Sequence, residues 1–216
     1  MTPQEIQSQI RYCNNLYGLL NLTAIVDGDI LELGVHKGQN SLIMGSWITR
    51  VLSMVDYKKK YIGFDTFSGY MPEDIDHAIS EANREGLLSN QEAGRWNVDP
   101  REVLEEIEEA NLGKVCDIVI GDIKEQVPRF LKEKGKDYSI SMLYIDCNAY
   151  LPAITALNSC KPHFSDGALL VTDEHRIGGE TAALKEFVEE DGRSLEIIDT
   201  NWVFPHGPKY YVRWKK

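Results

Sequence analysis

The stretch that decides the expected fold is residues 29–41, with the sequence DILELGVHKGQNS. It starts with an apolar run that ends at Gly34, continues through a loop with a second glycine at Gly38, and enters an amphipathic segment at Gln39. A strand, a glycine loop and a helix in succession are typical of the first βαβ unit of a parallel sheet. Glycines let a backbone approach a ligand closely, but they also serve tight turns, so the loop alone leaves both interpretations open.

Apolar runs and helical segments alternate along the rest of the chain. We expect parallel strands at 29–34, 60–65, 116–120, 140–146 and 168–172, and two late strands at 194–198 and 209–214 that form an antiparallel edge. Helices are expected at 39–55, 99–112, 123–134, 151–161 and 179–190. The sequence therefore predicts an α/β fold with a doubly wound, Rossmann-like, mostly parallel seven-stranded sheet and an antiparallel edge.

Length and composition favour a single domain that spans 1–216. The chain has 216 residues, of which 43% are hydrophobic, and this is enough for a substantial core. An N-terminal helical segment, 1–28, carries an apolar stripe made of Ile6, Ile10, Tyr17 and Leu20. The stripe would pack on the chain's own core or on a second subunit, and the second case predicts a homodimer. From about 66 to 98 the alternation breaks, which indicates an insertion.

Charge and cysteine usage argue against several classes of protein. The formal net charge is −11 and the basic runs are short, so we expect no nucleic-acid partner. No apolar stretch approaches the roughly 20 residues of a membrane span, and the polar N-terminus does not resemble a signal peptide. The four cysteines are scattered without a CxxC pair. We therefore expect a reduced, cytoplasmic protein that binds neither membrane nor structural zinc.

An acidic residue follows or closes each expected parallel strand. These residues are Glu32, Asp65, Asp122 (directly after Gly121), Asp146, and the pair Asp173 and Glu174, with His175 next in the chain. Open α/β sheets bind their ligands at the carboxyl ends of the strands. The pattern therefore predicts a polar ligand site along this edge of the sheet.

The first loop and Asp65 together indicate a nucleoside-binding site. The loop has the pattern ExGxxxG, without the GxGxxG of dinucleotide-binding proteins and without the Gly-Lys-Ser/Thr of a P-loop. Asp65 ends the next strand, 31 residues after Gly34. A carboxylate in this position can accept hydrogen bonds from both hydroxyls of a ribose, and we favour this role over that of a helix cap.

Asp146, Asp173 and Glu174 follow two strands that we expect to be neighbours. Three carboxylates at one edge would repel one another, and a hard cation such as Mg²⁺ would remove that conflict. His175 would act as a base, orient a ligand or only cap the loop, and His36 in the first loop leaves the same alternatives open.

Several segments resemble the macrocin O-methyltransferase family, which belongs to the class I methyltransferases. The resemblance lies in Glu32-Leu33-Gly34-Val35 with Gly38, Asn40 and Ser41, in Tyr61–Gly69 (YIGFDTFSG), in Tyr144–Pro152 (YIDCNAYLP) and in Leu170–His175 (LVTDEH). It covers most of residues 29–190. Asn148 and Glu174 stand where the family has Asp, and His175 stands where it has Tyr; Asn148 and Glu174 can still supply oxygen ligands.

The resemblance implies S-adenosyl-L-methionine and Mg²⁺ as cofactors and a hydroxyl of a sugar or natural-product-type small molecule as acceptor. The implied cofactor-binding residues are Glu32, Gly34, Val35, Gly38, Asn40, Ser41, Asp65, Thr66, Phe67, Gly121, Asp122 and Asp146. The implied metal ligands are Asp146, Asp173 and Glu174. The block at 66–98 would be a lid, where Trp96 would pack over a ligand; a core aromatic is the plainer interpretation of Trp96.

The main hypothesis is Mg²⁺-assisted O-methylation, with Asp146 or His175 as the catalytic residue that takes the acceptor's proton. One alternative is a metal-independent N- or O-methyltransferase. A second is a nicotinamide-dependent oxidoreductase, although the missing GxGxxG argues against it. A third is a non-catalytic binding protein that keeps the fold.

Overall fold

The computed structural model describes residues 2–50, 58–74, 93–173, 179–192, 196–197 and 210–215. Its sheet has the strand order β3-β2-β1-β4-β5-β7-β6. The parallel strands are β1 (Asp29–Leu33), β2 (Tyr61–Asp65), β3 (Cys116–Ile120), β4 (Ile140–Ile145) and β5 (Phe164–Thr172). The strands β6 (Glu196–Ile197) and β7 (Tyr210–Arg213) pair antiparallel at one edge. The predicted mostly parallel sheet with an antiparallel edge is confirmed.

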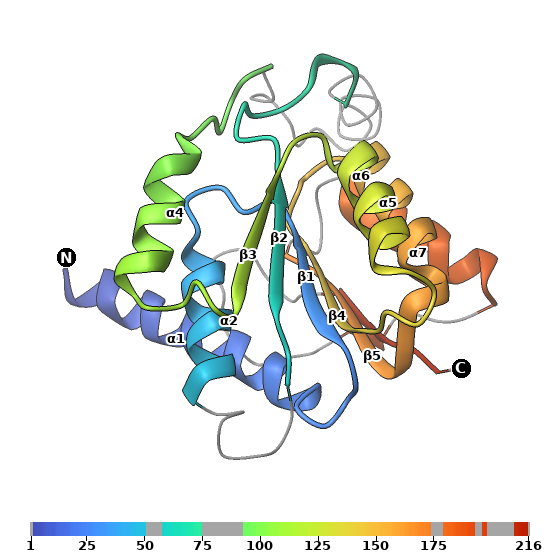
Figure 1. The fold of residues 1–216 in the computed structure, drawn as a ribbon, viewed down its shortest axis with the longest axis horizontal. Helices are drawn as coiled ribbons and strands as arrows, with labels where there is room; N and C mark the ends of the chain where they lie inside the picture. The colour runs from blue at the N-terminus through green and yellow to red at the C-terminus, as the bar shows by residue number, and fades with distance from the viewer. Residues whose placement is uncertain are drawn as a thin grey trace.

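Helices cover both faces of the sheet, as expected of a doubly wound fold (Figure 1). On one face lie α1 (Pro3–Leu22), α2 (Gln39–Arg50) and α4 (Pro100–Glu109). On the other lie α5 (Ile123–Lys134), α6 (Tyr150–Cys160) and α7 (Gly179–Glu190). A 3-10 turn, Lys161–His163, joins α6 to β5. The end predicted for the second helix, residues 51–55, lies outside the described residues.

One strand begins earlier than the sequence pattern predicted. We expected it at 168–172, but β5 already starts at Phe164, which pairs with Ile140 of β4. After Phe164, β5 continues through the non-apolar residues 165–167, and its pairing with β4 shifts register between Ile140 and Met142. Apolar periodicity cannot reveal a polar, irregular stretch of this kind, because its strand conformation is imposed by the neighbouring strand.

Two hydrophobic clusters hold the helices to the two faces of the sheet. In β1, Leu31 and Leu33 face the cluster that contains α5, α6 and α7, whereas Ile30 faces the cluster that contains α1 and α2. Successive side chains in a strand point to opposite faces, so a strand buried on both faces is apolar almost throughout. Glu32 breaks this rule, because it is a fully buried carboxyl group on the α2 side.

The N-terminal helix is attached by its second half. Leu16, Leu19 and Leu20 are buried, and the indole nitrogen of Trp47 in α2 donates to Asn21 Oδ1 at 2.9 Å. By contrast, Ile6 and Ile10 of the predicted apolar stripe are exposed. Of the described residues, none belongs to a helix that is both long and apolar enough to cross a membrane.

Strand register aligns the positions that carry the predicted site. Leu33 pairs with Phe64 on one side and with Ile145 on the other, and Ile145 pairs with Thr172. The residues that come directly after β1, β2, β4 and β5 therefore meet at one edge of the sheet. This edge is the carboxyl edge predicted from the acidic strand ends.

Candidate active site

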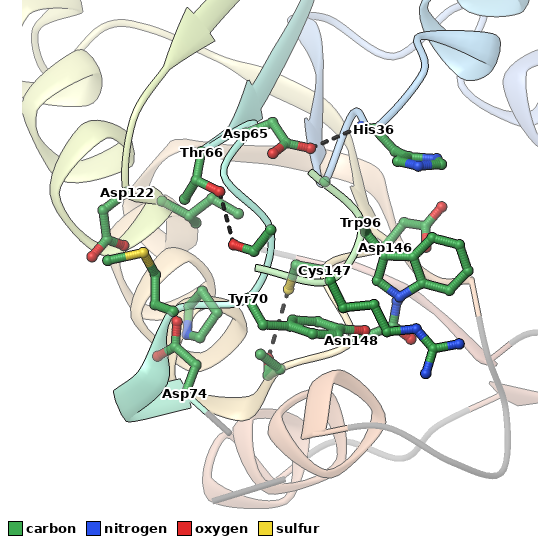
Figure 2. A pocket seen from close by; sticks show the side chains of 17 residues that line it. His36, Asp65, Thr66, Tyr70, Asp74, Trp96, Asp122, Asp146, Cys147 and Asn148 are labelled. Carbon is green, nitrogen blue, oxygen red and sulfur yellow. Dashed lines mark hydrogen bonds between the residues drawn. The ribbon is translucent and has the colours of Figure 1, made fainter. Parts of the chain in front are cut away.

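A cavity of about 250 Å³ opens at the carboxyl edge of the sheet (Figure 2). Five of the predicted cofactor-binding residues line it: Gly34, Asp65, Thr66, Asp122 and Asp146. They come from four separate segments of the chain, after β1, β2, β3 and β4. The sheet topology thus brings together residues that are up to about a hundred positions apart.

The carboxylate of Asp65 is fixed by backbone donors. Its Oδ2 accepts from the amides of Val35 at 2.7 Å and His36 at 2.8 Å, and its Oδ1 accepts from the amide of Phe67 at 2.7 Å. Figure 2 shows the link from Asp65 to the loop at His36. Each carboxylate oxygen can accept more than one hydrogen bond, so this anchored group retains capacity for a ligand in the cavity.

Gly34 lets the first loop touch the end of β4. Its φ of +92° lies in a region that favours glycine. A Cβ at this position would clash with the carbonyl oxygen of Asp146. Any larger residue would therefore push apart the two loops that form the floor of the cavity. The structure therefore explains this glycine by the close approach of two backbone segments, and its contact with a ligand stays a prediction.

Glu32, Asn40 and Ser41 do not line the cavity but form a buried network behind it. Asn40 Nδ2 donates to Glu32 Oε1 at 2.6 Å, and the hydroxyl of Tyr61 donates to Glu32 Oε2. Ser41 Oγ donates to the Tyr61 hydroxyl at 2.8 Å. Burial raises the pKa of Glu32 to about 8, against the opposing effect of these hydrogen bonds. The network fixes the start of α2 against β1 and β2.

The network extends to the N-terminal helix. The hydroxyl of Tyr12 in α1 donates to Asn40 Oδ1 at 2.5 Å. The pKa of Tyr12 is raised, first by burial and then by the charges of Asp173 and Asp146. Tyr12 therefore lies within electrostatic reach of the carboxylates at the ends of β4 and β5, and sequence analysis did not single it out.

Other predicted cofactor contacts serve packing. Val35 and Phe67 are buried in the core on the α2 side. A Cβ at Gly38 would lie 2.7 Å from Val103 Cγ1 of α4, and one at Gly121 would lie 2.8 Å from Gln126 Nε2. None of these four residues lines the cavity in the described part of the chain. Their glycine or apolar character is explained by close contacts between elements.

Asp146 and Asp173 stand side by side at the ends of β4 and β5. The pairing of Ile145 with Thr172 places them at adjacent register positions. Asp146 lines the cavity, whereas Asp173 Oδ1 accepts from the Tyr144 hydroxyl at 2.5 Å. The other predicted residues, Glu174 and His175, lie outside the described residues. Within the described ranges, no group of three His, Cys, Asp or Glu side chains is placed to hold a metal ion.

The end of the cavity away from Asp146 combines acidic residues, one of which caps a helix, with apolar side chains. Asp122 caps α5, accepting from the amide of Lys124 at 2.9 Å, and Lys124 Nζ also contacts Asp74 at 2.8 Å. Burial raises the pKa of Asp74. Met71, Ile123 and Pro152 line the same cavity. A flat, partly apolar group with hydrogen-bond donors would match this end.

The expectation that Trp96 is a core aromatic is wrong. Its side chain is 53% exposed and lines the cavity together with Arg95. The reason is tertiary: the amide of Tyr70 donates to the Arg95 carbonyl at 3.3 Å, and that of Val98 donates to the Phe67 carbonyl at 3.2 Å. This pairing fixes 93–98 along the rim of the cavity instead of in the core.

His36 also lines the cavity, so the structure places this predicted residue beside the candidate site. Its ring contacts that of Trp96 edge to face, with the centroids 5.4 Å apart. Desolvation lowers the pKa of His36, and the neighbouring Lys37 lowers it further. The neutral imidazole is therefore favoured near pH 7.

Comparison with known proteins identifies the class. A family described as a methyltransferase domain matches residues 31–175, more than half of the chain, so the chain belongs to this family. It is a methyltransferase that depends on S-adenosylmethionine. The oxidoreductase and non-catalytic alternatives are thereby set aside. No curated protein sequence matches the chain.

Solved structures share the fold. The calicheamicin methyltransferase CalS11 aligns with a TM-score of 0.77 and 23% identity, covering 96% of this chain and 80% of the other. The O-methyltransferase NovP aligns with a TM-score of 0.70 and 18% identity, covering 96% and 81%. A putative caffeoyl-CoA O-methyltransferase from Staphylococcus aureus aligns with a TM-score of 0.54 and 14% identity, covering 99% and 93%. At these identities the likeness establishes the fold.

Proposed function

We propose that this protein transfers a methyl group from S-adenosylmethionine to a hydroxyl of a small molecule. The observation that carries the proposal is the cavity in which the first-loop backbone at Gly34 meets Asp146, beside an Asp65 carboxylate fixed by three amides. The bound cofactor supplies an activated methyl group on a sulfonium, so positioning of the acceptor accounts for much of the rate.

The residues present fit this cofactor. Asp65 would hold the ribose hydroxyls, since its carboxylate is fixed and lines the cavity. The adenine would lie at the end formed by Asp122, Met71 and Ile123. The methionine part would lie along Gly34, where the first loop meets the end of β4 and both line the cavity.

We further propose that a Mg²⁺ ion assists the methyl transfer. The chemistry of the available donors suits a hard cation, because Asp146 and Asp173 are adjacent carboxylates and Asn148 adds an amide oxygen at the same rim. Asp146 and Asp173 would hold the ion, together with Glu174, which the sequence analysis predicts as a third ligand. There the ion would lower the pKa of an acceptor hydroxyl. A metal-independent methyltransferase remains the second candidate, because Asp173 is hydrogen-bonded to Tyr144.

Asp146 is the residue that we propose as proton acceptor, with His175 as the other candidate. Asp146 lines the cavity next to Gly34, so its carboxylate is within reach of a hydroxyl that approaches the methyl group. A base must lie within hydrogen-bond distance of the proton that it takes.

A sugar or natural-product-type acceptor is supported by the resemblance to the macrocin O-methyltransferase family. CalS11 is described as a TDP-rhamnose 3'-O-methyltransferase in calicheamicin biosynthesis, and NovP as an O-methyltransferase. These descriptions belong to those proteins, and here they support the choice of oxygen over nitrogen as the methylated atom.

Calorimetric titration with S-adenosylhomocysteine, with and without Mg²⁺, tests the proposal. We expect binding in the micromolar range, on the order of −8 kcal/mol. We also expect a separate Mg²⁺ titration that Asp173→Ala removes while cofactor binding persists. Cofactor binding without any effect of Mg²⁺ would favour the metal-independent candidate. A protein that does not bind S-adenosylhomocysteine at all would contradict the proposed function.

A further inference from the structure

An aromatic ring and a guanidinium group lie together at one side of the cavity. The Cζ atom of Arg95 is 4.9 Å from the ring centroid of Trp96, and both residues line the cavity. In Figure 2, Trp96 lies on the side of Asp146 and Asn148, away from Asp122 and Asp74. The pair therefore stands at the end where methyl transfer is proposed, not at the end proposed for adenine.

The backbone around this pair is held in uncommon conformations. Trp96, His36 and Asn148 have φ values of +70°, +49° and +56°, and all three line the cavity. Residues other than glycine rarely adopt this region, and those that do gather at sites that bind ligands. For Trp96 the result is an indole that is 53% exposed, so this conformation presents the ring to the cavity instead of to the core.

The charges around the cavity indicate where an anionic group would bind. The carboxylates that line it are Asp65, Asp74, Asp122 and Asp146. Asp74 and Asp122 pair with Lys124. The carboxylates of Asp65 and Asp146 suit the positively charged sulfonium and ammonium of the cofactor, and they repel an anion. Arg95 is the one Lys or Arg among the described residues that line the cavity. An anionic group on a second ligand would therefore be most favourable beside Arg95.

We propose that Arg95 and Trp96 form the acceptor subsite, which takes a ring-bearing acceptor with an anionic substituent, either a phosphate ester or a carboxylate. The ring of the acceptor lies against the Trp96 indole, and its anion pairs with the Arg95 guanidinium. Guanidinium groups bind carboxylates and phosphates through two parallel hydrogen bonds, and aromatic faces pack favourably against the rings of ligands. This inference rests on the proposed function, because it assumes that the cofactor fills the other end.

The cofactor's own carboxylate is the competing partner for Arg95. If the guanidinium held that group, Arg95→Gln would weaken binding of S-adenosylhomocysteine. If Arg95 belongs to the acceptor subsite, the same substitution leaves that affinity within about twofold of the unsubstituted protein and weakens only the anionic acceptor.

The experiment measures binding of three small probes to protein saturated with S-adenosylhomocysteine, by titration calorimetry. The probes are phenyl phosphate, phenylacetate and the neutral phenyl β-glucoside. We expect at least one anionic probe to bind about tenfold more tightly than the glucoside, and Arg95→Gln to remove that preference. The stronger of the two anionic probes identifies the phosphate or the carboxylate as the source of the charge. Trp96→Ala should weaken the binding of every probe that binds.

Arg129→Gln is the matched control, because Arg129 is an exposed arginine of α5 that pairs with Glu133 and does not line the cavity. It should leave all affinities unchanged. Three results would overturn the proposal: equal binding of charged and neutral probes, binding of none of them, or loss of S-adenosylhomocysteine affinity in Arg95→Gln. The initial titration with S-adenosylhomocysteine separates these outcomes from failure of the methyltransferase function itself.

Discussion

The carboxyl group of Glu32 shows how one residue departs from the apolar pattern of its strand. It is fully buried on the α2 side of β1, between Asn40 and Tyr61. Burial raises its pKa from 4.5 to about 8, so the folded protein keeps the proton where an exposed glutamate would release it. Between these two pH values the folded state binds more protons than the unfolded state, and stability must fall as pH rises.

Glu32→Gln should therefore flatten the pH dependence of stability. The side chain contributes a slope of up to about 1.4 kcal/mol per pH unit between roughly pH 4.5 and 8, and glutamine contributes none. Urea unfolding at several pH values measures the difference in slope between the two proteins. Glu133→Gln serves as a control, since the side chain of Glu133 is 67% exposed. Identical slopes for Glu32→Gln and the unsubstituted protein would show that Glu32 ionises normally.

At the scale of elements, the first loop is fixed from three directions. Gly34 lies against the end of β4, Gly38 lies against Val103 of α4, and Asp65 of β2 accepts hydrogen bonds from the loop amides. The loop is thus already organised for binding by contacts between elements, which reduces the entropy lost when a ligand binds.

Gly34→Ala should abolish or severely weaken cofactor binding. The new Cβ would clash with the carbonyl oxygen of Asp146, and the positive φ is unfavourable for alanine. We expect a loss of at least about tenfold in affinity for S-adenosylhomocysteine, together with lower stability of about 1–3 kcal/mol. Calorimetry and urea unfolding measure the two effects. Gly192→Ala is the comparison: its φ is also positive, +67°, but a Cβ there meets nothing within 4 Å. Cofactor affinity equal in both variants would argue against the placement of the cofactor at Gly34.

At the scale of the molecule, the cavity joins segments from both halves of the chain. Its walls come from the ends of β1, β2, β3 and β4 and from the rim at 93–98. A ligand that contacts all of these segments binds only when they are assembled. Cofactor binding should therefore stabilise the whole fold.

S-adenosylhomocysteine at a hundred times its dissociation constant should raise the free energy of unfolding by about 2.7 kcal/mol, and Tm by roughly 5–10 °C. Thermal unfolding followed by circular dichroism measures this shift. At the same concentration of S-adenosylhomocysteine, Asp65→Asn should reduce the shift in Tm, because the proposed ribose contact is weakened. Asp117→Asn should not, since Asp117 lies on β3 and pairs with Lys60 at an exposed position. An undiminished shift in Asp65→Asn would contradict the ribose role.

The sequence alone determined the order of strands and helices along the chain and the acidic edge of the sheet where the cavity lies. These features are local. Backbone geometry sets the side-chain period of strands and of helices, so each leaves its own apolar pattern in the sequence. A polar residue follows a buried strand because the chain leaves the sheet at that point. The placement of Gly34 and Asp65 beside the cavity could be predicted for the same reason, because both lie at the carboxyl end of a strand.

Only the tertiary structure decided which of these residues line the cavity and which support it. Glu32 bonds to Tyr61, 29 residues away, and Asn40 bonds to Tyr12, 28 residues away, so strand order and helix packing turn both away from the cavity. Trp96 looks like a core aromatic in the sequence, yet backbone pairing with 67–70 holds it at the rim. Local sequence patterns carry no information on such long-range contacts, because the contacts depend on which distant segments the folded sheet places side by side.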